Sequence, residues 1–478
     1  MMVLVLLLAG QTAIAETCDQ LGNPAGNEGR VHSDFCREWL ELHPCRQQLS
    51  KPCSTFTFGH LVDIAQTAAT GQPLHISYGS LAPQNGFGMG LAFVEHKDFA
   101  AEWRMTFNMD AVTSSNGSWR AGGYLKAYKL GGGKIVVVNG PGKKTAPFFH
   151  VSSFFNLYVE TNSLNRLYFY GLGPNTAQSA QAAFGMTETI IGTSAVVPLG
   201  KWGLSLFGEV NGRVPQLRGD HNDTVPSIEQ TYTEATAPGL ASQPVFVQPR
   251  LGVRAEPLLF KDHLRLHYLV DVQNFGGFDT SAYSFRRWTT DLGHEFPLNT
   301  KVSLTAANNA NGPDSCTPNP ETPCPAPMHT STAMDHEGSV NVRLLMVGSA
   351  ANSGSVVPFY FDPTLGGSDL DGQALLSSFP DYRFRGPNLA LLRESVEHAI
   401  PKVPLGVYFQ ADEGKVALRR GDINFTNLRE TYTVGLTVHA GGLPVVSLLF
   451  SWGGGEGNHT TFNVSNVLLG ASARPSLY

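Results

Sequence analysis

The sequence predicts an all-β protein: a transmembrane antiparallel β-barrel with a short Cys-rich N-terminal segment. Three observations favour this fold class. From Leu74 onward, apolar residues recur with period two in segments of about ten residues, and turn residues separate these segments. Charged residues make up only 15% of the 478 residues, whereas a soluble protein has about 25%. The N-terminus also has the features of an export signal.

The overall charge argues against a nucleic-acid partner. The 33 Lys and Arg residues and the 39 Asp and Glu residues give a formal net charge of −6 at pH 7. Binding to a phosphate backbone depends on basic residues, so we expect no nucleic acid among the partners. A run of about 18 apolar residues, which a membrane-spanning helix needs, does not occur. These two exclusions leave a secreted protein or a transmembrane β-barrel.

The N-terminal region predicts export. Residues 3–8 are apolar, and Ala13-Ile14-Ala15 has the small-x-small pattern of a signal-peptide cleavage site. We therefore expect a signal peptide over residues 1–15, although no Lys or Arg precedes its apolar core. The alternative is a buried N-terminal strand. After cleavage, residues 16–70 would form a Cys-rich segment that acts as a cap, a plug or a spacer.

The six cysteines predict disulfide bonds, because an exported chain meets an oxidising compartment. Cys316 and Cys324 stand in the Pro-rich run 313–327, so we expect them to close a short loop by bonding to each other. No His stands near the cysteines at the spacing of a zinc finger, so no metal site is expected. The other four would pair among themselves in one of three ways: Cys18, Cys36, Cys45 and Cys53.

The alternation places one apolar and one polar face on each predicted strand, most clearly in 201–214 and 263–274. In a membrane barrel the apolar face would contact lipid and the polar face would line a watery lumen. The same alternation also fits a β-sandwich with solvated outer faces. On the barrel interpretation, five polar residues of these two segments are predicted to lie on the lumen wall: Glu209, Arg213, Arg265, His267 and Asp271.

The candidate strands are slightly more numerous than a closed barrel needs. The absence of a linker between Leu74 and Leu469 favours one large sheet over several sandwich domains. The expected long loops are 218–243, 310–339 and 354–386. The candidate strands centre on 74–82, 86–97, 101–113, 118–130, 151–160, 165–172, 184–198, 201–214, 245–258, 263–274, 283–296, 301–309, 340–349, 387–400, 403–418, 430–441, 444–453 and 460–469.

Several motifs resemble those of one known family. Leu365-Gly366-Gly367 and Tyr382-Arg383-Phe384 are similar to parts of an inward-folded loop that reads Leu-Gly-Gly, then Arg-Gly-aromatic, then Tyr-Arg-Phe. Residues 167–175 resemble an aromatic-Gly turn of the same barrels, and residues 450–465 resemble their last two strands. On these motifs, residues 150–470 resemble the BamA/TamA-like surface-antigen family of bacterial outer-membrane β-barrel proteins.

The resemblance implies the architecture in more detail. It implies about 16 strands in an outer-membrane barrel over residues 71–478. It also implies a loop near 354–386 that folds into the lumen. The candidate site residues within this lumen loop are Gly366, Gly367, Phe379, Tyr382, Arg383, Phe384, Arg385 and Gly386.

The chain departs from the family pattern at the tip of this loop. Ser377-Ser378 stands where the family has Arg-Gly, whose arginine is expected to bind an acidic group on the barrel wall. Arg383 and Arg385 are the remaining cations, with Glu209 or Asp271 as conceivable partners. The alternative is that both arginines are solvated. In either case the tip is expected to be held less firmly than in the family.

The resemblance implies a gated pore in the bacterial outer membrane, or a barrel there that assists the insertion or export of a protein client. Its partners would be outer-membrane lipid and that client, without a small-molecule cofactor. Family members that handle proteins carry separate periplasmic domains, and none fits within residues 16–70. The alternatives are a passive porin and a secreted β-sandwich adhesin or glycan-active protein. We expect no enzymatic activity, because no Gly-x-Ser-x-Gly, His-Glu-x-x-His or phosphate-loop motif occurs.

Overall fold

The computed structural model describes most of the predicted barrel. The predicted signal peptide, the Cys-rich segment and all six cysteines lie outside the described residues, so the disulfide pairing stays a prediction. The described residues are 73–100, 103–129, 153–200, 203–220, 224–260, 263–298, 301–308, 328–335, 338–400, 403, 405–440 and 443–464.

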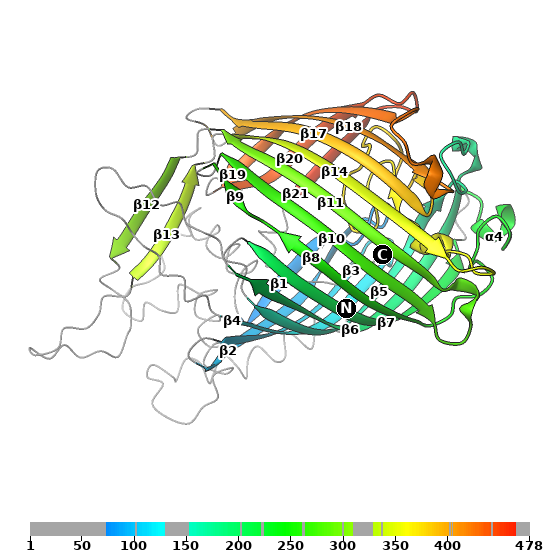
Figure 1. Cartoon of the computed structure of the whole chain (residues 1–478), viewed down its shortest axis with the longest axis horizontal. Coiled ribbons are helices and arrows are strands. Elements are labelled where there is room, and N and C mark those ends of the chain that lie inside the picture. The colour runs from blue at the N-terminus through cyan, green and yellow to red at the C-terminus, as the bar shows by residue number, and fades with distance from the viewer. Residues whose placement is uncertain are drawn as a thin grey trace, which may run out of the picture.

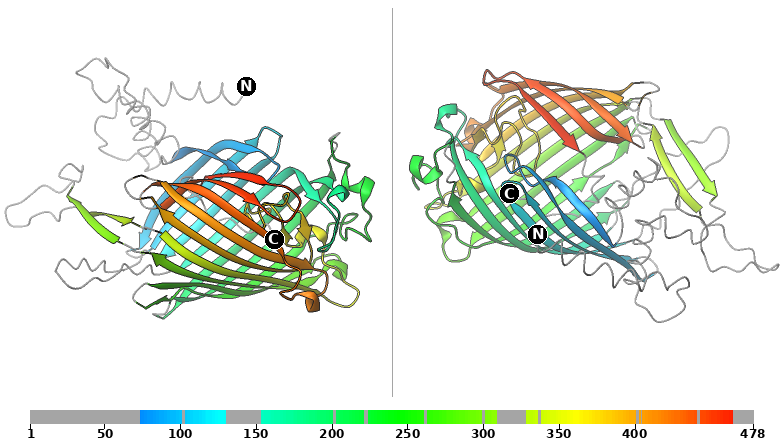
Figure 2. Two further views of the ribbon diagram at one scale, coloured as in Figure 1. Left: turned by 90° about the horizontal axis from the view of Figure 1, so that it is seen from above. Right: turned by 180° about the vertical axis from the view of Figure 1, so that it is seen from behind.

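A single large antiparallel sheet dominates the fold. Of its 17 strands, β8 (Phe246–Ala255) and β9 (Leu258–Leu259) both pair with β10 (Leu264–Gly277) and share one position, which leaves 17 − 1 = 16 positions. The sheet curves round on itself into a barrel (Figure 1, Figure 2). The predicted all-β antiparallel barrel of about 16 strands is confirmed. The β-sandwich alternative, which requires two large sheets packed face to face, is wrong for the described part of the chain.

The bounds of the strands agree with most of the predicted segments. Two further small sheets lie outside the barrel sheet: β12 (Lys301–Asn308) pairs with β13 (Met328–Asp335), and β15 (Thr364–Leu365) pairs with β16 (Phe384–Arg385). The other barrel strands are β1 (Leu74–Ser80), β2 (Phe87–Ala100), β3 (Trp103–Ser114), β4 (Trp119–Lys129), β5 (Phe154–Phe169), β6 (Ala182–Leu199), β7 (Leu204–Gly219), β11 (Phe285–Leu298), β14 (Gly338–Ala351), β17 (Asn388–Ala399), β18 (Leu405–Ala417), β19 (Arg429–Ala440), β20 (Leu443–Trp452) and β21 (His459–Val464).

Three predicted strand segments differ from the structure, and the predicted loop 310–339 contains one strand, β13. The segments 151–160 and 165–172 form one strand, β5, whose register shifts between Leu164 and Leu167. That irregularity interrupts the alternation, which is why the sequence suggested two strands. The segment 301–309 is a strand, but it pairs with β13 outside the barrel sheet (Figure 1).

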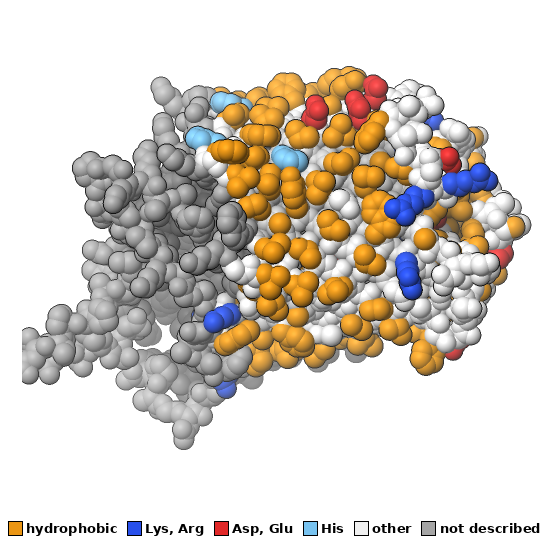
Figure 3. Space-filling model, in the orientation of Figure 1, with side chains coloured by type: hydrophobic (Ala, Val, Ile, Leu, Met, Phe, Trp, Pro, Cys, Tyr) orange, Lys and Arg blue, Asp and Glu red, His pale blue; other side chains and the backbone are white. Residues whose placement is uncertain are grey.

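The barrel wall has the polarity that the alternation predicts, which is the reverse of that of a soluble protein. On β10, Val270 and Val272 face outward and are 49% and 54% exposed, whereas Asp271 between them is 1% exposed. On β7, Val210 is half exposed and Arg213 is fully buried. Hydrophobic side chains cover much of the outer surface of the strands in Figure 3. The outer face is therefore apolar and the inner face carries the polar groups.

Helical structure is short throughout the described residues. It comprises α4 (Ile228–Thr231) and four 3-10 turns: η1 (Gln178–Ala180), η2 (Ser281–Tyr283), η3 (Phe359–Phe361) and η4 (Arg420–Asp422). None of these helical segments is long and apolar enough to cross a membrane.

The two edge strands of the sheet are β1 and β21. In the described residues, β1 pairs only with β2, and β21 pairs only with β20. Every other barrel position has a neighbour on each side. The hydrogen-bond ladder between β1 and β21 that would complete the circle is absent from the described residues.

Candidate functional site

The connection between β14 and β17, residues 352–387, folds back inside the barrel (Figure 2). We call it the inner loop. Its strands β15 and β16 pair Thr364 with Arg385 and Leu365 with Phe384, which closes residues 366–383 into a hairpin-like excursion. Most side chains from Phe359 to Arg385 are buried, so the inner loop packs against the wall rather than extending into solvent.

Two glycines allow the ends of this excursion to approach closely. Gly366 and Gly367 have φ angles of 99° and 60°. A Cβ at Gly366 would lie 2.5 Å from the Cβ of Arg383, and one at Gly367 would lie 2.6 Å from the backbone nitrogen of Asp381. Only glycine combines this backbone conformation with such a close approach, which explains the Leu-Gly-Gly motif.

The base of the inner loop is aromatic. Phe359 and Phe361, both in η3, are at most 1% exposed. The ring of Phe359 lies 4.8 Å from that of Phe169 and 5.2 Å from that of Phe184. The ring of Phe361 contacts further inward-facing rings, those of Phe246, Phe275 and Phe285, at centroid distances of 5.1, 5.1 and 6.2 Å. The base is therefore held by apolar burial.

Arg383 joins the inner loop to two other connections of the barrel. Its Nε and Nη2 donate to the two carboxylate oxygens of Glu456 at 2.6 and 2.8 Å, which is the bidentate geometry of a strong ion pair. Its Nη1 and Nη2 donate to the hydroxyl and carbonyl oxygens of Thr176 at 2.8 and 2.6 Å. The guanidinium also stacks on Phe384, 4.6 Å from the ring centroid. Arg383 is thus a buried anchor rather than a solvated residue.

Arg385 anchors the neck of the inner loop near its aromatic base. Its Nη1 donates to the carbonyl of Phe359 at 2.9 Å, and its own carbonyl accepts from the amide of Gly173 at 2.7 Å. Asp362 is buried close by, and burial raises the pKa of its carboxyl to about 8 against the opposing charges of Arg287 and Arg385. Arg287, on β11, also donates to the carbonyl of Phe361. The base thus combines its aromatic packing with buried polar groups that bind Arg287 and Arg385.

The tip of the inner loop is held by hydrogen bonds to the wall and by the burial of Leu375, Leu376 and Phe379. Ser378 shares a hydrogen bond of 2.7 Å with Thr431 on β19, and the amide of Leu376 donates to Asp412 on β18 at 3.0 Å. Arg393 on β17 bonds both Asp412 and the carbonyl of Ala374. A cation of the wall, Arg393, therefore binds the tip.

The remaining predicted loop residues pack around these anchors. The ring of Phe379 lies 5.1 Å from that of Phe384 and covers Gly454, where a Cβ would clash with it. The hydroxyl of Tyr382 donates to the carbonyl of Pro83 at 3.1 Å. The amide of Gly386 donates to the carbonyl of Pro363 at 3.3 Å.

The predicted wall acids bind wall cations instead of the inner loop. Arg250 contacts both Asp271, at 2.9 Å, and Glu209, at 3.8 Å. The other predicted wall residues also pair across neighbouring strands: Arg213 with Glu188 at 2.8 Å, Arg265 with Glu295 at 3.5 Å and His267 with Glu295 at 3.2 Å. The suggestion that Glu209 or Asp271 binds Arg383 or Arg385 is therefore corrected: Arg383 binds Glu456, and Arg385 binds the carbonyl of Phe359.

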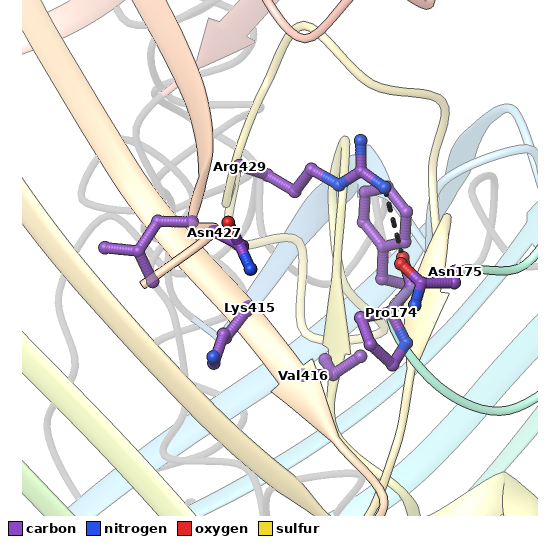
Figure 4. A pocket seen from close by; sticks show the side chains of 8 residues that line it. Pro174, Asn175, Lys415, Val416, Asn427 and Arg429 are labelled. Atoms are coloured by element: carbon purple, nitrogen blue, oxygen red, sulfur yellow. Dashed lines mark hydrogen bonds between the residues drawn. The ribbon is translucent and has the colours of Figure 1, made fainter. Parts of the chain in front are cut away.

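A small pocket remains beside the neck of the inner loop (Figure 4). Its volume is about 280 Å³, and Pro174, Phe384 and Val416 are among its lining residues. Arg429 and Lys415 both line it, but they point away from each other (Figure 4). Arg429 donates to the carbonyl of Pro174 at 3.3 Å, whereas Lys415 donates to Asn424 at 2.6 Å. The pocket therefore lacks the convergent cations of an anion site.

Sequence reasoning missed several anchoring residues. Arg287 and Arg393 lie in predicted strands, and their inward position follows from the alternation, so they could have been identified as wall cations. Glu456 lies in a Gly-rich turn without periodicity, so no signal in the sequence marked it as the partner of Arg383. No group of three or more His, Cys, Asp or Glu side chains in the described residues could hold a metal ion.

Comparison with known proteins finds similarity among solved structures alone: no family model and no curated protein matches the chain. The BamA structure from Haemophilus ducreyi lacking POTRA domains 1–3 aligns with a TM-score of 0.46 and 12% identity, over 81% of this chain and 67% of that one. CdiB from Acinetobacter baumannii aligns with a TM-score of 0.42 and 13% identity, over 81% and 58%. CdiB from Escherichia coli aligns with a TM-score of 0.45 and 10% identity, over 80% and 59%. The chain thus spans less than two thirds of either CdiB structure.

Proposed function

We propose that this chain is a β-barrel of the bacterial outer membrane that acts as a gated pore and assists the assembly or export of a protein client. The observation that carries the proposal is the inner loop, which occupies the lumen and is anchored there in part by the ion pair between the buried Arg383 and the partly exposed Glu456. The loop also packs through buried apolar side chains, but this ion pair is a polar contact that another partner can replace, which suits the release of part of the loop.

The polarity of the wall supports a membrane location. The outer face exposes large apolar side chains on most strands, including Leu251 at 60% and Ile191 at 59%. Such a continuous apolar surface would promote aggregation in water and is what lipid contact requires. The inner face carries ion pairs instead, such as Arg213–Glu188. A water-filled lumen inside a lipid-facing wall accounts for both faces.

The protein client is supported by the chemistry of the lumen and by the motif resemblance of the inner loop. Wall arginines pair with wall acids across neighbouring strands, which leaves a polar lining of mixed charge. A lining of this kind binds neither sign of charge strongly, so a polypeptide of ordinary composition can pass along it. The Leu-Gly-Gly and Tyr-Arg-Phe motifs support the same proposal, because they resemble motifs of barrels that insert or export proteins.

Fractionation and planar-bilayer recording test the proposal together. We expect the full chain in the outer-membrane fraction, with heat-modifiable migration, and a low basal conductance that rises when residues 366–386 are deleted. Recovery as a soluble periplasmic monomer would contradict the membrane location. A conductance that stays steady and unchanged after the deletion would contradict gating and favour a passive porin. A strain that lacks the gene tests the role in client assembly or export. We expect it to lose that assembly or export and to regain it when the wild-type chain is supplied.

A further inference from the structure

A groove lies on the outer face of the wall, across the strands from β5 to β10, and we call it the outer groove. Its volume is about 580 Å³, within the range of about 300–1,000 Å³ that is usual for small-molecule sites. Ala195 on β6 and Gly208 on β7 pair with each other and form a low floor, because neither has a side chain beyond Cβ. A Cβ added at Gly208 would come no closer than 3.9 Å to the strands beside it, so space is open above the floor. Larger apolar residues line the groove and are 47–60% exposed: Phe155, Val210, Leu251 and Val272.

One margin of the outer groove is polar. Asn274 on β10 lines the groove and is exposed on the outer face. It pairs with Arg286 on β11, which is exposed on the same face, so their Cβ atoms lie about 4.5–5.5 Å apart. Neither side chain has a hydrogen bond or an ion pair with any residue that the structure describes. A cation and an amide, both without a partner there, therefore stand together beside an apolar groove.

The sheet itself is interrupted at the same margin. On β8, Val247 pairs with Gly276 and Arg250 with Gln273, but the two residues between them, Gln248 and Pro249, have no paired partner on β10. Pro249, which lines the groove, also has no N–H to donate. Backbone groups that lack a partner are costly where a wall faces lipid. A polar group of a ligand is therefore favoured at this place.

The polar margin lies at the level of lipid headgroups. Trp288 stands two residues from Arg286 on β11 and pairs with Val272 of the groove. Tryptophan is enriched where a membrane meets water, and a nearby arginine can extend its charged head to that boundary. The guanidinium of Arg420 lies over the Trp288 ring, 5.2 Å from its centroid, and adds a second positive charge. The outer groove thus begins beside cations and continues over apolar wall.

We propose that the outer groove binds one anionic phospholipid, with an acyl chain over Gly208 and Ala195 and the phosphate at Arg286 and Asn274. The inference goes beyond the proposed function and rests on its membrane location. Charge complementarity selects this ligand, because the phosphate supplies the anion that Arg286 lacks and accepts from the Asn274 amide. A second copy on the same face would bring Arg286 towards its equivalent, and like charges disfavour that occupant.

Native mass spectrometry of the full chain in detergent, titrated with lipid, resolves each binding event. The probe is phosphatidylglycerol, and phosphatidylcholine with the same acyl chains is the matched lipid, because its choline cation opposes Arg286. We expect the first phosphatidylglycerol to bind with a Kd about tenfold lower than the first phosphatidylcholine, which corresponds to about 1.4 kcal/mol. Equal Kd values for the two lipids would overturn the proposal. Glycerol phosphate at the same concentration should not compete, because it has no acyl chain, and competition by it would show a site for free phosphate instead.

One pair of variants tests the headgroup contact. Arg286→Gln removes the cation and should raise the Kd of the first phosphatidylglycerol about tenfold, to that of phosphatidylcholine. Lys97→Gln is the matched control, because it removes one positive charge from an exposed residue of β2, which does not line the groove. It should change the Kd by no more than about twofold. A preference for phosphatidylglycerol that survives Arg286→Gln would contradict the proposal.

A second set of variants tests the acyl-chain contact. Gly208→Leu fills the floor of the groove and should weaken the first binding of both lipids about tenfold, the factor that the loss of about two buried methylenes supplies. Ala195→Leu fills the same floor from β6 and should act alike, and heat-modifiable migration checks that each variant forms the barrel. Gly212→Leu is the matched control, because Gly212 lies on β7 outside the groove. An equal loss with Gly212→Leu, or no loss with either groove variant, would rule the groove out as the chain site.

The lipid titration separates this inference from the proposed function. If the chain forms no pore and serves no client, but its first phosphatidylglycerol still depends on Arg286 and Gly208, the lipid site stands and the proposed function fails. If deletion of residues 366–386 opens a pore while Arg286→Gln and Gly208→Leu leave lipid binding unchanged, gating stands and the lipid site fails.

Discussion

The base and the tip of the inner loop are both buried against the wall, but through different side chains. At the base, the Phe359 and Phe361 rings are buried among wall phenylalanines, and each buried ring contributes about 1.5–3 kcal/mol. At the tip, Leu375, Leu376 and Phe379 are buried against the wall, the neutral hydrogen bond of Ser378 contributes about 0.5–1.5 kcal/mol, and the bond from the Leu376 amide to the Asp412 carboxylate contributes about 1.5–3 kcal/mol. We expect the tip to detach before the base, because the single ring of Phe361 packs against three wall phenylalanines. Arg383 lies between the two ends and binds Glu456.

The largest effect is expected at the base. Phe361→Ala removes a ring that packs against three wall phenylalanines and should lower the free energy of unfolding by about 3–5 kcal/mol. Unfolding in urea, followed by loss of heat-modifiable migration, measures this change. Phe425→Ala is the matched control, because that ring is 67% exposed and should change stability little. If Phe361→Ala lowered the free energy of unfolding by less than about 1 kcal/mol, the base would not hold the inner loop more firmly than the tip does.

The second effect concerns the anchor between base and tip. Arg383→Ala leaves the Glu456 carboxylate without its bidentate partner and removes charged hydrogen bonds that contribute about 1.5–3 kcal/mol. We expect a higher open-state conductance in planar bilayers, and a smaller rise for Arg383→Lys, which keeps the charge but not the fork geometry. Arg385→Ala should also raise conductance. Unchanged conductance in all three variants would show that the inner loop is not the gate.

The third effect is a pH dependence of stability that arises from Asp362 at the base of the inner loop. The pKa of Asp362 is raised to about 8, so the folded state holds a proton that the unfolded carboxyl, with a pKa of about 3.9, has lost at neutral pH. The contribution of this carboxyl to the free energy of unfolding is largest below pH 4 and declines as the pH rises towards 8. Unfolding measured between pH 5 and 9 should show this decline in the wild type. Asp362→Asn should flatten it, and an identical slope in both proteins would refute the assignment.

The smallest effect is expected at the tip. Ser378→Ala removes one neutral hydrogen bond to Thr431 and should lower the free energy of unfolding by about 0.5–1.5 kcal/mol. Brief opening events in single-channel records should become more frequent, because the tip is the weaker end. If Ser378→Ala destabilised the barrel as strongly as Phe361→Ala, the contrast between base and tip would be lost.

The sequence was sufficient to predict the two faces of the barrel wall, because the alternation of apolar and polar residues is a local property. The inward position of Asp271 and the outward position of Val270 follow from their neighbours alone. The inner loop was found through the resemblance of its Leu-Gly-Gly and Tyr-Arg-Phe motifs. The partner of Arg383 could not be found in either way, because Glu456 lies 73 residues away in a turn that only the closed tertiary structure brings close. The inward phenylalanines at the base were missed because they break the polar pattern of the inner face.

The paired charges of the wall also bear on which ions would move through an opened lumen. On the inner face, arginines of six strands have carboxylate partners on adjoining strands: Arg120 with Asp110, Arg213 with Glu188, Arg250 with Asp271, Arg265 with Glu295, Arg343 with Asp291 and Arg393 with Asp412. Each pair contributes almost no net field along the axis, so cations and anions meet similar barriers. Under a salt gradient, the reversal potential of the open state should therefore lie close to zero.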